Sequence, residues 1–320
     1  MPKDNPLVTI FGGSGFLGRY VVRVLARRGY RIKVAVRRPD LAGYLQPLGR
    51  VGQIHAVQAN LRYPDSVKAA AHGADVVINL VGILFERGRQ RFRQVHAEGA
   101  GHVAAAAAEG GARMLHVSAI GADADSRAAY ARSKRAAEEA VLSATPSATI
   151  FRPSVMFGPE DEFFNRFAAM ATLSPALPLI GGGGARFQPV YVDDVANAIA
   201  AGADGLTRPG VIYELGGPAV LTLRQVFEFT LATIERKRLL VPVPFAVAKA
   251  IGAVAQFLPS PPITPDQVEL LRYDNVVSEA AKRERRTLDD LGVAPTAVEA
   301  IAPSYLWRFR KTGQFRRSLA

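Results

Sequence analysis

The chain has 320 residues, of which 49% are hydrophobic and 21% are charged, and none is cysteine. This composition is that of a globular protein with a sizeable core, and it excludes disordered, collagen-like and disulfide-stapled chains. Without cysteine, zinc–thiolate sites, iron–sulfur clusters and a cysteine nucleophile are excluded as well. The formal net charge of +12 favours anionic partners, such as nucleotides, anionic lipid or an acidic protein face.

Neither a metal site nor a membrane span is expected. The histidines have no spacing typical of zinc ligands and are interpreted as packed or surface residues. The longest apolar stretch, Val241–Leu258, is interrupted by Pro242, Pro244 and Lys249 and is too short to span a bilayer. Because the first residues match neither a secretion signal nor an Arg-rich presequence, we expect a cytoplasmic protein, soluble or peripheral to the inner membrane.

Short β-rich runs alternate with helical patterns in the first half of the chain, which is typical of a parallel sheet between helices. The run Val76–Gly82 is rich in Val, Ile and Leu, as in a strand that is buried on both faces. We therefore predict an α/β fold with a doubly wound parallel (Rossmann) sheet. The expected strands are Leu7–Phe11, Arg31–Val36, Gln53–Gln58, Asp75–Val81, Ala112–Ser118 and Ala148–Arg152, and the expected helices are Gly15–Arg28, Pro64–His72, Arg91–Glu109 and Arg127–Leu142.

The spacing becomes irregular after Pro153, where we expect a smaller C-terminal α/β domain for substrate or partner contacts. The two domains are placed at residues 1–177 and 178–320, with a strand or helix exchanged between them. Asp193 and Asp194 precede an apolar helix, and an N-cap role is favoured over acid catalysis. The other expected elements are strands at Gln188–Val192 and Val211–Leu215 and a helix at Leu223–Lys237.

The first expected strand runs into a glycine-rich turn that opens the first helix. Gly12 permits the tight turn, Gly15 lets the backbone approach a pyrophosphate, and Gly18 lets the helix pack on the strand. The exposed N–H groups and the helix dipole favour phosphate binding there. The predicted dinucleotide site therefore consists of Gly12, Gly13, Ser14, Gly15, Phe16, Leu17 and Gly18.

Arg37 and Arg38 follow the second expected strand, where an NAD-specific site would carry an acid for the ribose 2′-hydroxyl. Guanidinium groups at this place suit a 2′-phosphate. Asp40 comes too late in the chain to replace the missing acid. The sequence therefore favours NADP(H) over NAD(H), with solvated surface arginines as the alternative interpretation.

Further motifs resemble those of the short-chain dehydrogenase/reductase superfamily in its extended or atypical branch. Asn60-Leu61 is similar to the Asp-Leu pair that holds the adenine in that superfamily, with Asn in place of Asp. Val81-Gly82 matches the turn under the cofactor ribose, and Arg152-Pro153-Ser154 resembles the turn that faces the nicotinamide. The resemblance implies that Asn60, Leu61, Val81, Gly82, Pro153 and Ser154 contact the cofactor.

A catalytic set follows from the same resemblance. Ser118 ends the fifth expected strand, and Tyr130 and Lys134 match the superfamily's Tyr-x-x-x-Lys motif. This spacing places Tyr130 and Lys134 one turn apart on one helix face. The resemblance implies that Lys134 lowers the tyrosine pKa and binds the nicotinamide ribose, that Tyr130 transfers a proton, and that Ser118 binds the substrate oxygen.

Nearly the whole chain resembles the nucleotide-binding accessory subunits of respiratory complex I and their bacterial homologues. The resemblance implies an NADPH-binding accessory or assembly protein of complex I whose cofactor is mainly structural. Because Ser118, Tyr130 and Lys134 are all present, an NADP-dependent oxidoreductase or epimerase/dehydratase stays open as the alternative. The matching segments are Asn79–Gly82, His116–Asp123, Tyr130–Lys134, Pro189–Ala196 and Pro261–Val277.

Two segments in the second half are candidates for partner contacts. Val243–Leu258 is apolar apart from Lys249, which predicts a buried helix or a face for a membrane or an apolar partner. The tail Trp307–Arg317 interleaves aromatic and cationic residues, as in segments that lie on anionic lipid or an acidic subunit, or it is a solvated end. The expected partners are complex I subunits and an anionic membrane surface. Nucleic acid is not expected, because no nucleic-acid motif accompanies the basic residues.

Overall fold

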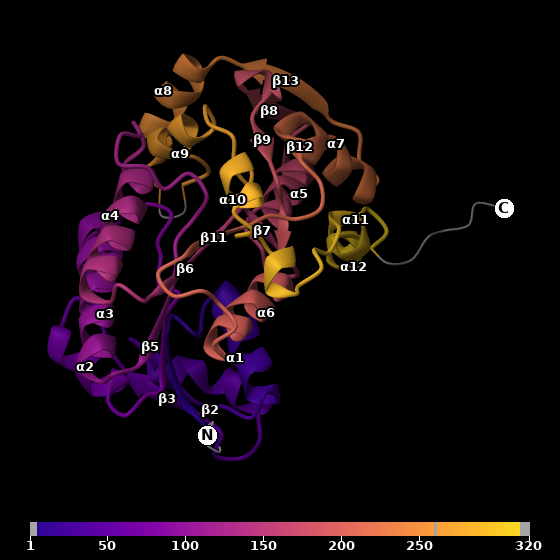
Figure 1. The fold of residues 1–320 in the computed structure, drawn as a ribbon. Coiled ribbons are helices and arrows are strands. Elements are labelled where there is room, and N and C mark those ends of the chain that lie inside the picture. Colours follow the sequence, from indigo (N-terminus) through magenta and orange to yellow (C-terminus); the bar gives the residue numbers. More distant parts are fainter. Residues whose placement is uncertain (1–4, 259–260, 314–320) are drawn as a thin grey trace. The chain divides into compact units, whose positions relative to one another are not determined.

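The computed structural model describes residues 5–258 and 261–313 (Figure 1). The chain divides into two compact units and enters each of them more than once. The first unit contains Met1–Pro153, Asp193–Leu215 and Ser278–Ala294, and the second contains Ser154–Val192, Gly216–Val277 and Pro295–Ala320.

A parallel sheet of seven strands forms the centre of the first unit. Its strand order is β11-β6-β5-β4-β1-β2-β3, so the direction of winding reverses between β1 and β4. The predicted doubly wound parallel sheet is therefore confirmed. The strands are β1 (Leu7–Phe11), β2 (Arg31–Val36), β3 (Ile54–Gln58), β4 (Val76–Asn79), β5 (Arg113–Val117), β6 (Thr149–Pro153) and β11 (Ile212–Leu215).

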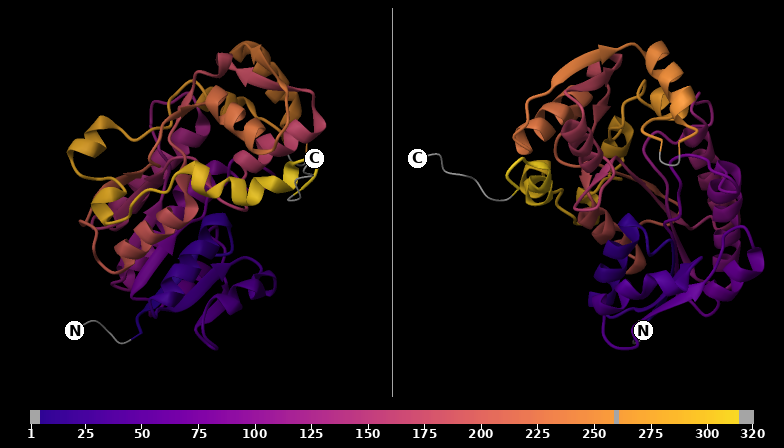
Figure 2. Two further views of the ribbon diagram at one scale, coloured as in Figure 1. Left: turned by 90° about the vertical axis from the view of Figure 1, so that its right-hand side faces the viewer. Right: turned by 180° about the vertical axis from the view of Figure 1, so that it is seen from behind.

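Helices cover both faces of this sheet, with α2, α3 and α4 on one face and α1 and α6 on the other (Figures 1 and 2). Small side chains let α3 and α4 approach closely, because Ala100, Ala104 and Ala137 are fully buried. The helices of this unit are α1 (Phe16–Arg27), α2 (Pro64–Ala71), α3 (Gly99–Glu109), α4 (Ala129–Ala144), most of α6 (Val192–Ala203) and α10 (Glu279–Arg283), with 3-10 turns at Pro39–Leu48 and Asp289–Leu291 and a π-helical turn at Arg93–Glu98.

The second unit is built from three two-stranded sheets and short helices around an aromatic core. Phe157, Phe164 and Phe227 are almost completely buried at its centre. The strands pair as β7 (Met156–Phe157) with β10 (Val190–Tyr191), β8 (Ala176–Ile180) with β13 (Leu239–Val243), and β9 (Arg186–Phe187) with β12 (Leu221–Thr222). The helices are α5 (Phe164–Leu173), α7 (Leu223–Thr233), α8 (Phe245–Ala255), α9 (Pro265–Leu270), α11 (Val298–Ile301) and α12 (Pro303–Leu306).

Two local expectations differ from the structure. The strand expected at Gln188–Val192 shortens to β10, because Gln188 N–H donates to the carbonyl of Asn275 (3.0 Å) and Pro189 has no N–H to give. Helix α6 therefore begins at Val192, and Asp193 and Asp194 lie inside its first turn rather than at the N-cap. Carboxylates in the first turn are still stabilised by the positive end of the helix dipole.

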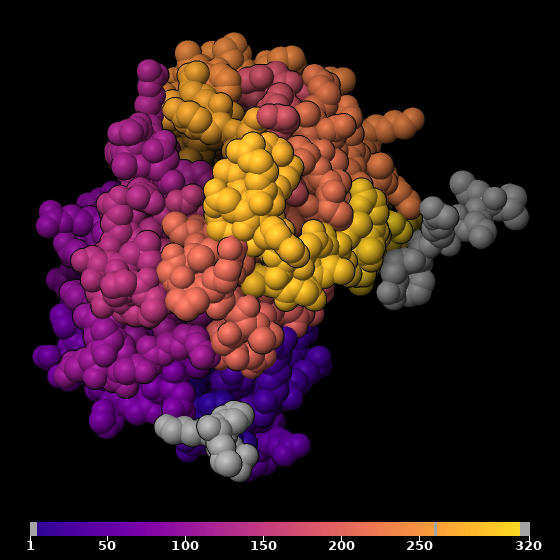
Figure 3. All heavy atoms as spheres, viewed as in Figure 1, coloured from indigo at the N-terminus to yellow at the C-terminus, as the bar shows by residue number. Residues whose placement is uncertain are grey.

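The apolar segment Val243–Leu258 contains α8 (Phe245–Ala255), which packs through a narrow stripe of small residues. Ala248, Gly252 and Ala255 are buried, and a Cβ at Gly252 would lie 3.0 Å from the nitrogen of Pro265. The prediction of a buried helix is therefore met on one face only, and α8 lies at the outer surface of its unit (Figures 1 and 3). Val247, Ile251, Val254, Phe257 and Leu258 are each half or more exposed.

The first part of the C-terminal tail is fastened to α7. Arg310 Nε donates to the carbonyl of Thr233 (2.9 Å), and Arg236 Nε donates to the carbonyl of Phe309 (2.8 Å). Phe315, Arg316 and Arg317, which belong to the predicted partner segment, lie outside the described residues. Across residues 5–258 and 261–313, no helix has both the length and the apolar character that crossing a membrane requires.

Candidate functional site

The predicted nucleotide site lies at the carboxyl ends of β1 and β4, where the strand order of the sheet reverses. Open parallel sheets bind ligands at such a point, because the loops on either side of it diverge. A Cβ at Gly12 would lie 3.1 Å from Cγ2 of Val81 and 3.2 Å from the carbonyl carbon of Leu80, in the turn after β4. Gly12 also has a φ of +81°, which side chains rarely adopt. Both constraints require glycine at this position.

The glycine turn folds tightly onto the start of α1. Gly15 N–H donates to the carbonyl of Gly12 (3.0 Å). A Cβ at Gly18 would lie 2.5 Å from the carbonyl carbon of Gly13, and a Cβ at Gly13 would lie 2.8 Å from Cγ1 of Val34. Side chains at these two glycines would push the helix, the turn and the sheet apart.

Helix α1 begins at Phe16 with an N-cap glycine, no side-chain cap and no acid in its first turn. Within α1 and its N-cap, therefore, no side-chain cap and no carboxylate of the first turn offsets the N–H groups and the positive dipole end of the helix. Ser14 and Leu17 continue the same backbone path. The segment from Gly13 to Leu17 is the part of the site that suits a phosphate.

The two arginines after β2 are exposed but differ in their contacts. Arg38 donates from Nε and Nη2 to the carboxylate oxygens of Asp40, at 3.0 and 2.7 Å. These hydrogen bonds lower the pKa of Asp40 and raise that of Arg38. Within residues 5–258 and 261–313, Arg37 has neither an ion pair nor a hydrogen bond. Arg37 is therefore the guanidinium group that a ligand can reach without competing with a carboxylate.

Tyr44 lies beside the glycine turn, although the sequence did not single it out. Its hydroxyl donates to the carbonyl of Ser14 (2.5 Å), and the guanidinium carbon of Arg19 lies 5.5 Å from its ring centroid. The 3-10 turn that starts directly after Arg38 carries this tyrosine. In the sequence, one aromatic residue between glycine and proline looks like an ordinary surface residue, so no signal distinguishes it.

Asn60 and Leu61 form the turn after β3. Asn60 N–H donates to Oγ of Ser66 (3.1 Å), and Asn60 Oδ1 accepts the N–H of Arg62 (3.2 Å). The side chain of Leu61 is buried in the core, where a Cβ on Gly99 would lie 3.0 Å from it. The amide of Asn60 therefore shapes the turn at the edge of the site, while Leu61 anchors that turn to α3.

Asn79, His96 and His116 fasten the turn that follows β4 and includes Val81 and Gly82. Asn79 Oδ1 accepts the N–H of Val81 (3.1 Å), and its Nδ2 lies 3.3 Å from Nδ1 of His116. Nε2 of His96 accepts the N–H of Ile83 (2.9 Å). The turn is thus held by side chains at both of its ends.

His96 links this turn to the helix that carries Tyr130. Because Nε2 accepts a hydrogen bond, the ring proton lies on Nδ1, which donates to Oγ of Ser133 (2.8 Å). Ser133 Oγ donates in turn to the carbonyl of Tyr130 (2.7 Å). Burial, with Lys134 nearby, lowers the pKa of His96 to about 2, so the ring is neutral.

From the sequence, His96 was interpreted like the other histidines as a packed or surface residue. Its ring reaches Tyr130, with 5.7 Å between the ring centroids, because the chain makes a π-helical turn at Arg93–Glu98. Such turns often occur at functional sites and have no clear sequence signature. The contact therefore depends on a backbone irregularity that periodicity does not reveal.

Ser118 directly follows β5, and Tyr130 and Lys134 lie on α4. Lys134 Nζ donates to the carbonyl of Val117 (3.3 Å) and lies 5.9 Å from the ring centroid of Tyr130. Burial lowers the pKa of Lys134 to about 8 and raises that of Tyr130 to about 12. Among the described residues, the buried Oγ of Ser118 has no hydrogen-bond partner. This hydroxyl is thus available to a bound molecule.

A buried ion pair anchors α4 to the sheet. Arg152 on β6 donates from Nε and Nη2 to both carboxylate oxygens of Glu138, at 2.7 and 2.6 Å. Glu214 on β11 lies 3.7 Å from the same guanidinium group. Glu138 is one turn from Lys134, and its charge raises the pKa of that lysine against the effect of burial. A residue outside the Tyr-x-x-x-Lys motif therefore helps to keep the lysine charged.

Pro153 and Ser154 fall on opposite sides of the division between the two units. Pro153 ends β6 in the first unit. The hydroxyl of Ser154, in the second unit, lies 2.7 Å from Oδ1 of Asn275 and 2.9 Å from its carbonyl oxygen. In this structure Ser154 is engaged within the second unit.

The residues of the first unit fit a dinucleotide. A turn that only glycine can form adjoins an uncapped helix N-terminus, and the next strand is followed by a guanidinium group, that of Arg37, with no partner in the described part of the chain. At the other end of the site, Ser118 Oγ and His116 Nε2 are buried without a hydrogen-bond partner among the described residues. Within those residues, no group of three His, Asp or Glu is placed to hold a metal ion.

Comparison with known proteins identifies the relatives of the chain. The model of the NAD dependent epimerase/dehydratase family matches residues 8–216. The alpha subcomplex subunit 9 of mitochondrial NADH dehydrogenase [ubiquinone] 1 from Arabidopsis thaliana is 39% identical over 320 residues, which cover 96% of this chain and 79% of that protein. The 40 kDa subunit of mitochondrial NADH-ubiquinone oxidoreductase from Neurospora crassa is 30% identical over 309 residues, 96% of this chain and 80% of that protein.

The chain is also similar to a curated enzyme and to a protein of known structure. The ceramide reductase of Caulobacter vibrioides is 37% identical over 195 residues, which cover 61% of this chain and 60% of that protein. The dTDP-glucose 4,6-dehydratase of Streptomyces venezuelae, solved with NAD bound, is 19% identical with a TM-score of 0.69, and the match covers 95% of this chain and 96% of that chain. At this identity the structural likeness shows a shared fold.

The neutral histidines of the site predict how stability depends on pH. The pKa of His96 falls to about 2 and that of His116 to about 3, both chiefly through burial, whereas the unfolded chain binds these protons near pH 6.5. Stability is therefore fully present above pH 6.5 and is lost as the pH falls below it. Each histidine should lower the free energy of unfolding by about 2 kcal/mol between pH 6.5 and pH 5.

Urea unfolding at pH 7.5 and pH 5 measures this dependence. Between these two pH values, the free energy of unfolding of the variant His96→Asn should fall by only about half as much as that of the wild-type chain. The matched control His72→Asn, at an exposed position, should keep the wild-type decrease. An equal decrease in His96→Asn and in the wild-type chain would contradict the assignment of a neutral buried histidine.

Proposed function

The chain belongs to the NAD dependent epimerase/dehydratase family, and we propose that it is an NADPH-binding accessory or assembly protein of respiratory complex I. In this proposal the cofactor is mainly structural. The observation that carries it is the 39% identity, over 96% of the chain, to a subunit of mitochondrial NADH dehydrogenase. Because the match covers 96% of the chain, it includes the second unit. In that unit, the surfaces of a partner-binding protein would differ from those of an enzyme.

The cofactor would lie along the carboxyl edge of the sheet in the first unit. The glycine turn and the start of α1 would hold its pyrophosphate, Asn60 its adenine side, and Lys134 the nicotinamide ribose. When bound, NADPH can supply a hydride. The proposed contact residues are Gly12, Gly13, Ser14, Gly15, Phe16, Leu17, Gly18, Arg37, Arg38, Asn60, Leu61, Val81, Gly82, Tyr130, Lys134, Pro153 and Ser154.

A tightly bound cofactor would stabilise the fold that it occupies. Such a molecule would bridge the turn after β1 and the turn after β4, which approach each other at Gly12, Leu80 and Val81. A ligand present at a thousandfold excess over its Kd adds about 4 kcal/mol to the free energy of unfolding. That gain explains how a nucleotide site can serve a subunit without turnover.

The state of Arg37 supports NADPH over NADH. Its guanidinium group is exposed and unpaired among the described residues, at the position where NAD-specific sites carry an acid. A 2′-phosphate accepts hydrogen bonds from an arginine fork with good geometry. Arg38 would have to share its guanidinium group between Asp40 and the phosphate.

The second unit supplies a surface for the partner. The outer face of α8 is apolar over the exposed Val247, Ile251 and Val254, and the exposed Phe257 follows just after the helix. From Arg236 to Pro265 the chain has four cations and no acid. Apolar side chains with flanking cations suit the interface between a membrane and its embedded proteins. We place the chain on the cytoplasmic face of the inner membrane as a peripheral protein bound to complex I subunits, with the tail Trp307–Arg317 as a further contact.

A second candidate function is that of an NADP-dependent reductase or an epimerase/dehydratase. The buried hydroxyl of Ser118 favours it, because this hydroxyl has no hydrogen-bond partner among the described residues and a structural site has no need of a free donor at that place. Tyr130 would hold and transfer a proton, and Ser118 would donate to the carbonyl oxygen of the substrate. The similarity to a ceramide reductase makes a lipid-derived ketone the first substrate to test.

Complex I association tests the main proposal. The tagged chain, extracted in mild detergent, should co-purify with complex I subunits. Replacement of Ile251, Val254 and Phe257 by Ser should abolish this association and leave the bound nucleotide unchanged, because α8 lies outside the first unit. A control with Leu173, Leu206 and Val220 replaced by Ser removes exposed apolar side chains elsewhere and should still associate. Membranes that co-purify without any complex I subunit would contradict the proposal.

The two arginines after β2 predict a difference in cofactor affinity. The variant Arg37→Ala should weaken NADPH binding by about tenfold or more and leave NADH binding nearly unchanged, because one charge-assisted phosphate contact is lost. Arg38→Ala should have the smaller effect, since Asp40 already occupies that side chain. Titration by intrinsic fluorescence measures both. Equal loss of NADPH and NADH affinity in Arg37→Ala would contradict the 2′-phosphate assignment.

Tyr130→Phe tests the enzymatic alternative. If the chain reduces a ketone with NADPH, this variant should lose about 10²- to 10⁴-fold in kcat, because the proton donor is removed. NADPH binding should persist, and Tyr63→Phe, at an exposed position, should retain full activity. Full activity in Tyr130→Phe would rule out the proposed donor. The assay follows NADPH oxidation with a ketone derived from a ceramide.

A further inference from the structure

Positive charge is concentrated in one stretch of the first unit. Between Arg19 and Arg50 the only acid is Asp40. This stretch therefore carries a net charge of +8 out of the +12 of the whole chain. Its basic residues are Arg19, Arg23, Arg27, Arg28, Arg31, Lys33, Arg37, Arg38 and Arg50.

Intramolecular carboxylates neutralise only some of these cations. Arg23 pairs with Asp193, Arg28 with Asp204 and Arg38 with Asp40. Among the described residues, Arg27, Arg31 and Arg50 form no ion pair. All three line one hollow of about 580 Å³, and none of the described residues in its lining is an acid. The hollow is formed by the C-terminal end of α1, the start of β2 and the loop before β3.

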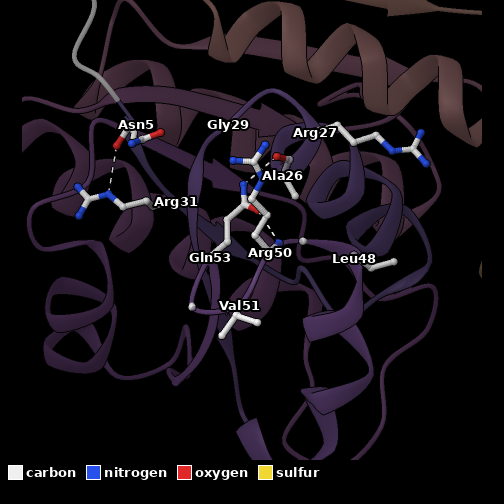
Figure 4. A pocket seen from close by; sticks show the side chains of 11 residues that line it. Asn5, Ala26, Arg27, Gly29, Arg31, Leu48, Arg50, Val51 and Gln53 are labelled. Atoms are coloured by element: carbon white, nitrogen blue, oxygen red, sulfur yellow. Dashed lines mark hydrogen bonds between the residues drawn. The ribbon is translucent and has the colours of Figure 1, made fainter.

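The three arginines of the hollow direct their guanidinium groups to different sides (Figure 4). Figure 4 shows Arg50 between Arg31, which is directed towards Asn5, and Arg27, which is directed the opposite way. A single phosphate would need guanidinium groups that converge on one point. Cations directed to different sides instead suit an extended chain with carboxylates at intervals, because a strand advances about 3.3 Å per residue. Leu48 and Val51 add apolar surface for the side chains between those carboxylates.

The side chain of Gln53 fixes the loop that carries Arg50. Its Oε1 accepts the N–H of Arg50 (2.8 Å), and its Nε2 donates to the carbonyls of Ala26 (2.7 Å) and Tyr30 (3.0 Å). The loop before β3 is thus tied to the end of α1. A rigid surface loses little entropy when a partner binds.

A purely structural role explains only part of this arrangement. Arg27 is in the last turn of α1, where the helix dipole favours a cation. That effect falls off within one turn of the helix, so it accounts neither for Arg50 nor for Arg31 at the start of β2. Surface arginines of ordinary kind are also usually accompanied by acids, which this lining lacks.

We propose that the hollow lined by Arg27, Arg31 and Arg50 binds an extended acidic segment of a partner protein. The inference rests on the proposed function and deepens it, by naming the chemistry of one partner contact of the accessory subunit. It uses a surface other than the nucleotide site and α8. Charge complementarity of this kind would speed association and make it sensitive to salt.

A labelled peptide of alternating Glu and Ala residues serves as the probe. It is titrated onto the full chain saturated with NADPH, so that Arg37 and Arg38 are occupied. Replacement of Arg27, Arg31 and Arg50 by Gln should weaken peptide binding by at least about tenfold and flatten its salt dependence. A control with Arg127, Arg224 and Arg283 replaced by Gln removes the same charge at exposed positions and should bind nearly as the wild-type chain. Asp4→Asn, the acid nearest to Asn5 in the sequence, is included to test for competition by the chain itself.

The outcomes separate this inference from the proposed function. Equal peptide affinity in the two triple variants would overturn the inference, because general charge would then explain binding. The same preparations are assayed for co-purifying complex I subunits. A wild-type chain that binds the peptide through these arginines but never associates with complex I would overturn the proposed function and leave the acidic-segment site supported.

Discussion

The close approach of the turn after β1 to the turn after β4 determines the rest of the nucleotide site. Gly12 permits it, since a Cβ there would lie only 3.1 to 3.2 Å from atoms of Val81 and Leu80, and Gly18 lets α1 pack against the same glycine turn. The approach leaves the start of α1 uncapped at the point where the strand order reverses. A helix N-terminus without a carboxylate is electrostatically suited to a phosphate. The family relationship and the local geometry therefore both point to a bound dinucleotide.

The far end of the site shows how a buried lysine is kept charged and in place. Burial lowers the pKa of Lys134 to about 8, while Glu138 one turn along the helix opposes that shift. Glu138 is itself bound by Arg152, and the neutral His96 ties the turn after β4 to the same helix. Such a network suits a rigid site for a permanent ligand and equally suits catalysis. The intact set of Ser118, Tyr130 and Lys134 is thus compatible with both proposed functions.

The sequence predicted the parallel sheet well, because its strands are short, apolar and separated by helical periods. The predicted bounds of β1 and β2, for example, coincide with the structure. The site was harder to predict, since the role of His96 depends on a π-helical turn and that of Glu138 on its pairing with Arg152 of β6. The exposed fraction of α8 could not be predicted either, because the apolar sequence of this helix does not show whether one face or all faces are buried. These features depend on tertiary contacts, which the periodicity of the sequence does not reveal.

The most direct test of the account is the nucleotide content of the gently purified chain. Mass spectrometry after denaturation identifies any bound nucleotide, and exchange with labelled NADPH measures how fast it leaves. A mainly structural cofactor predicts one NADPH per chain that does not exchange over hours. An empty site, or one that exchanges within seconds, would contradict that claim and favour an enzyme that turns over its cofactor.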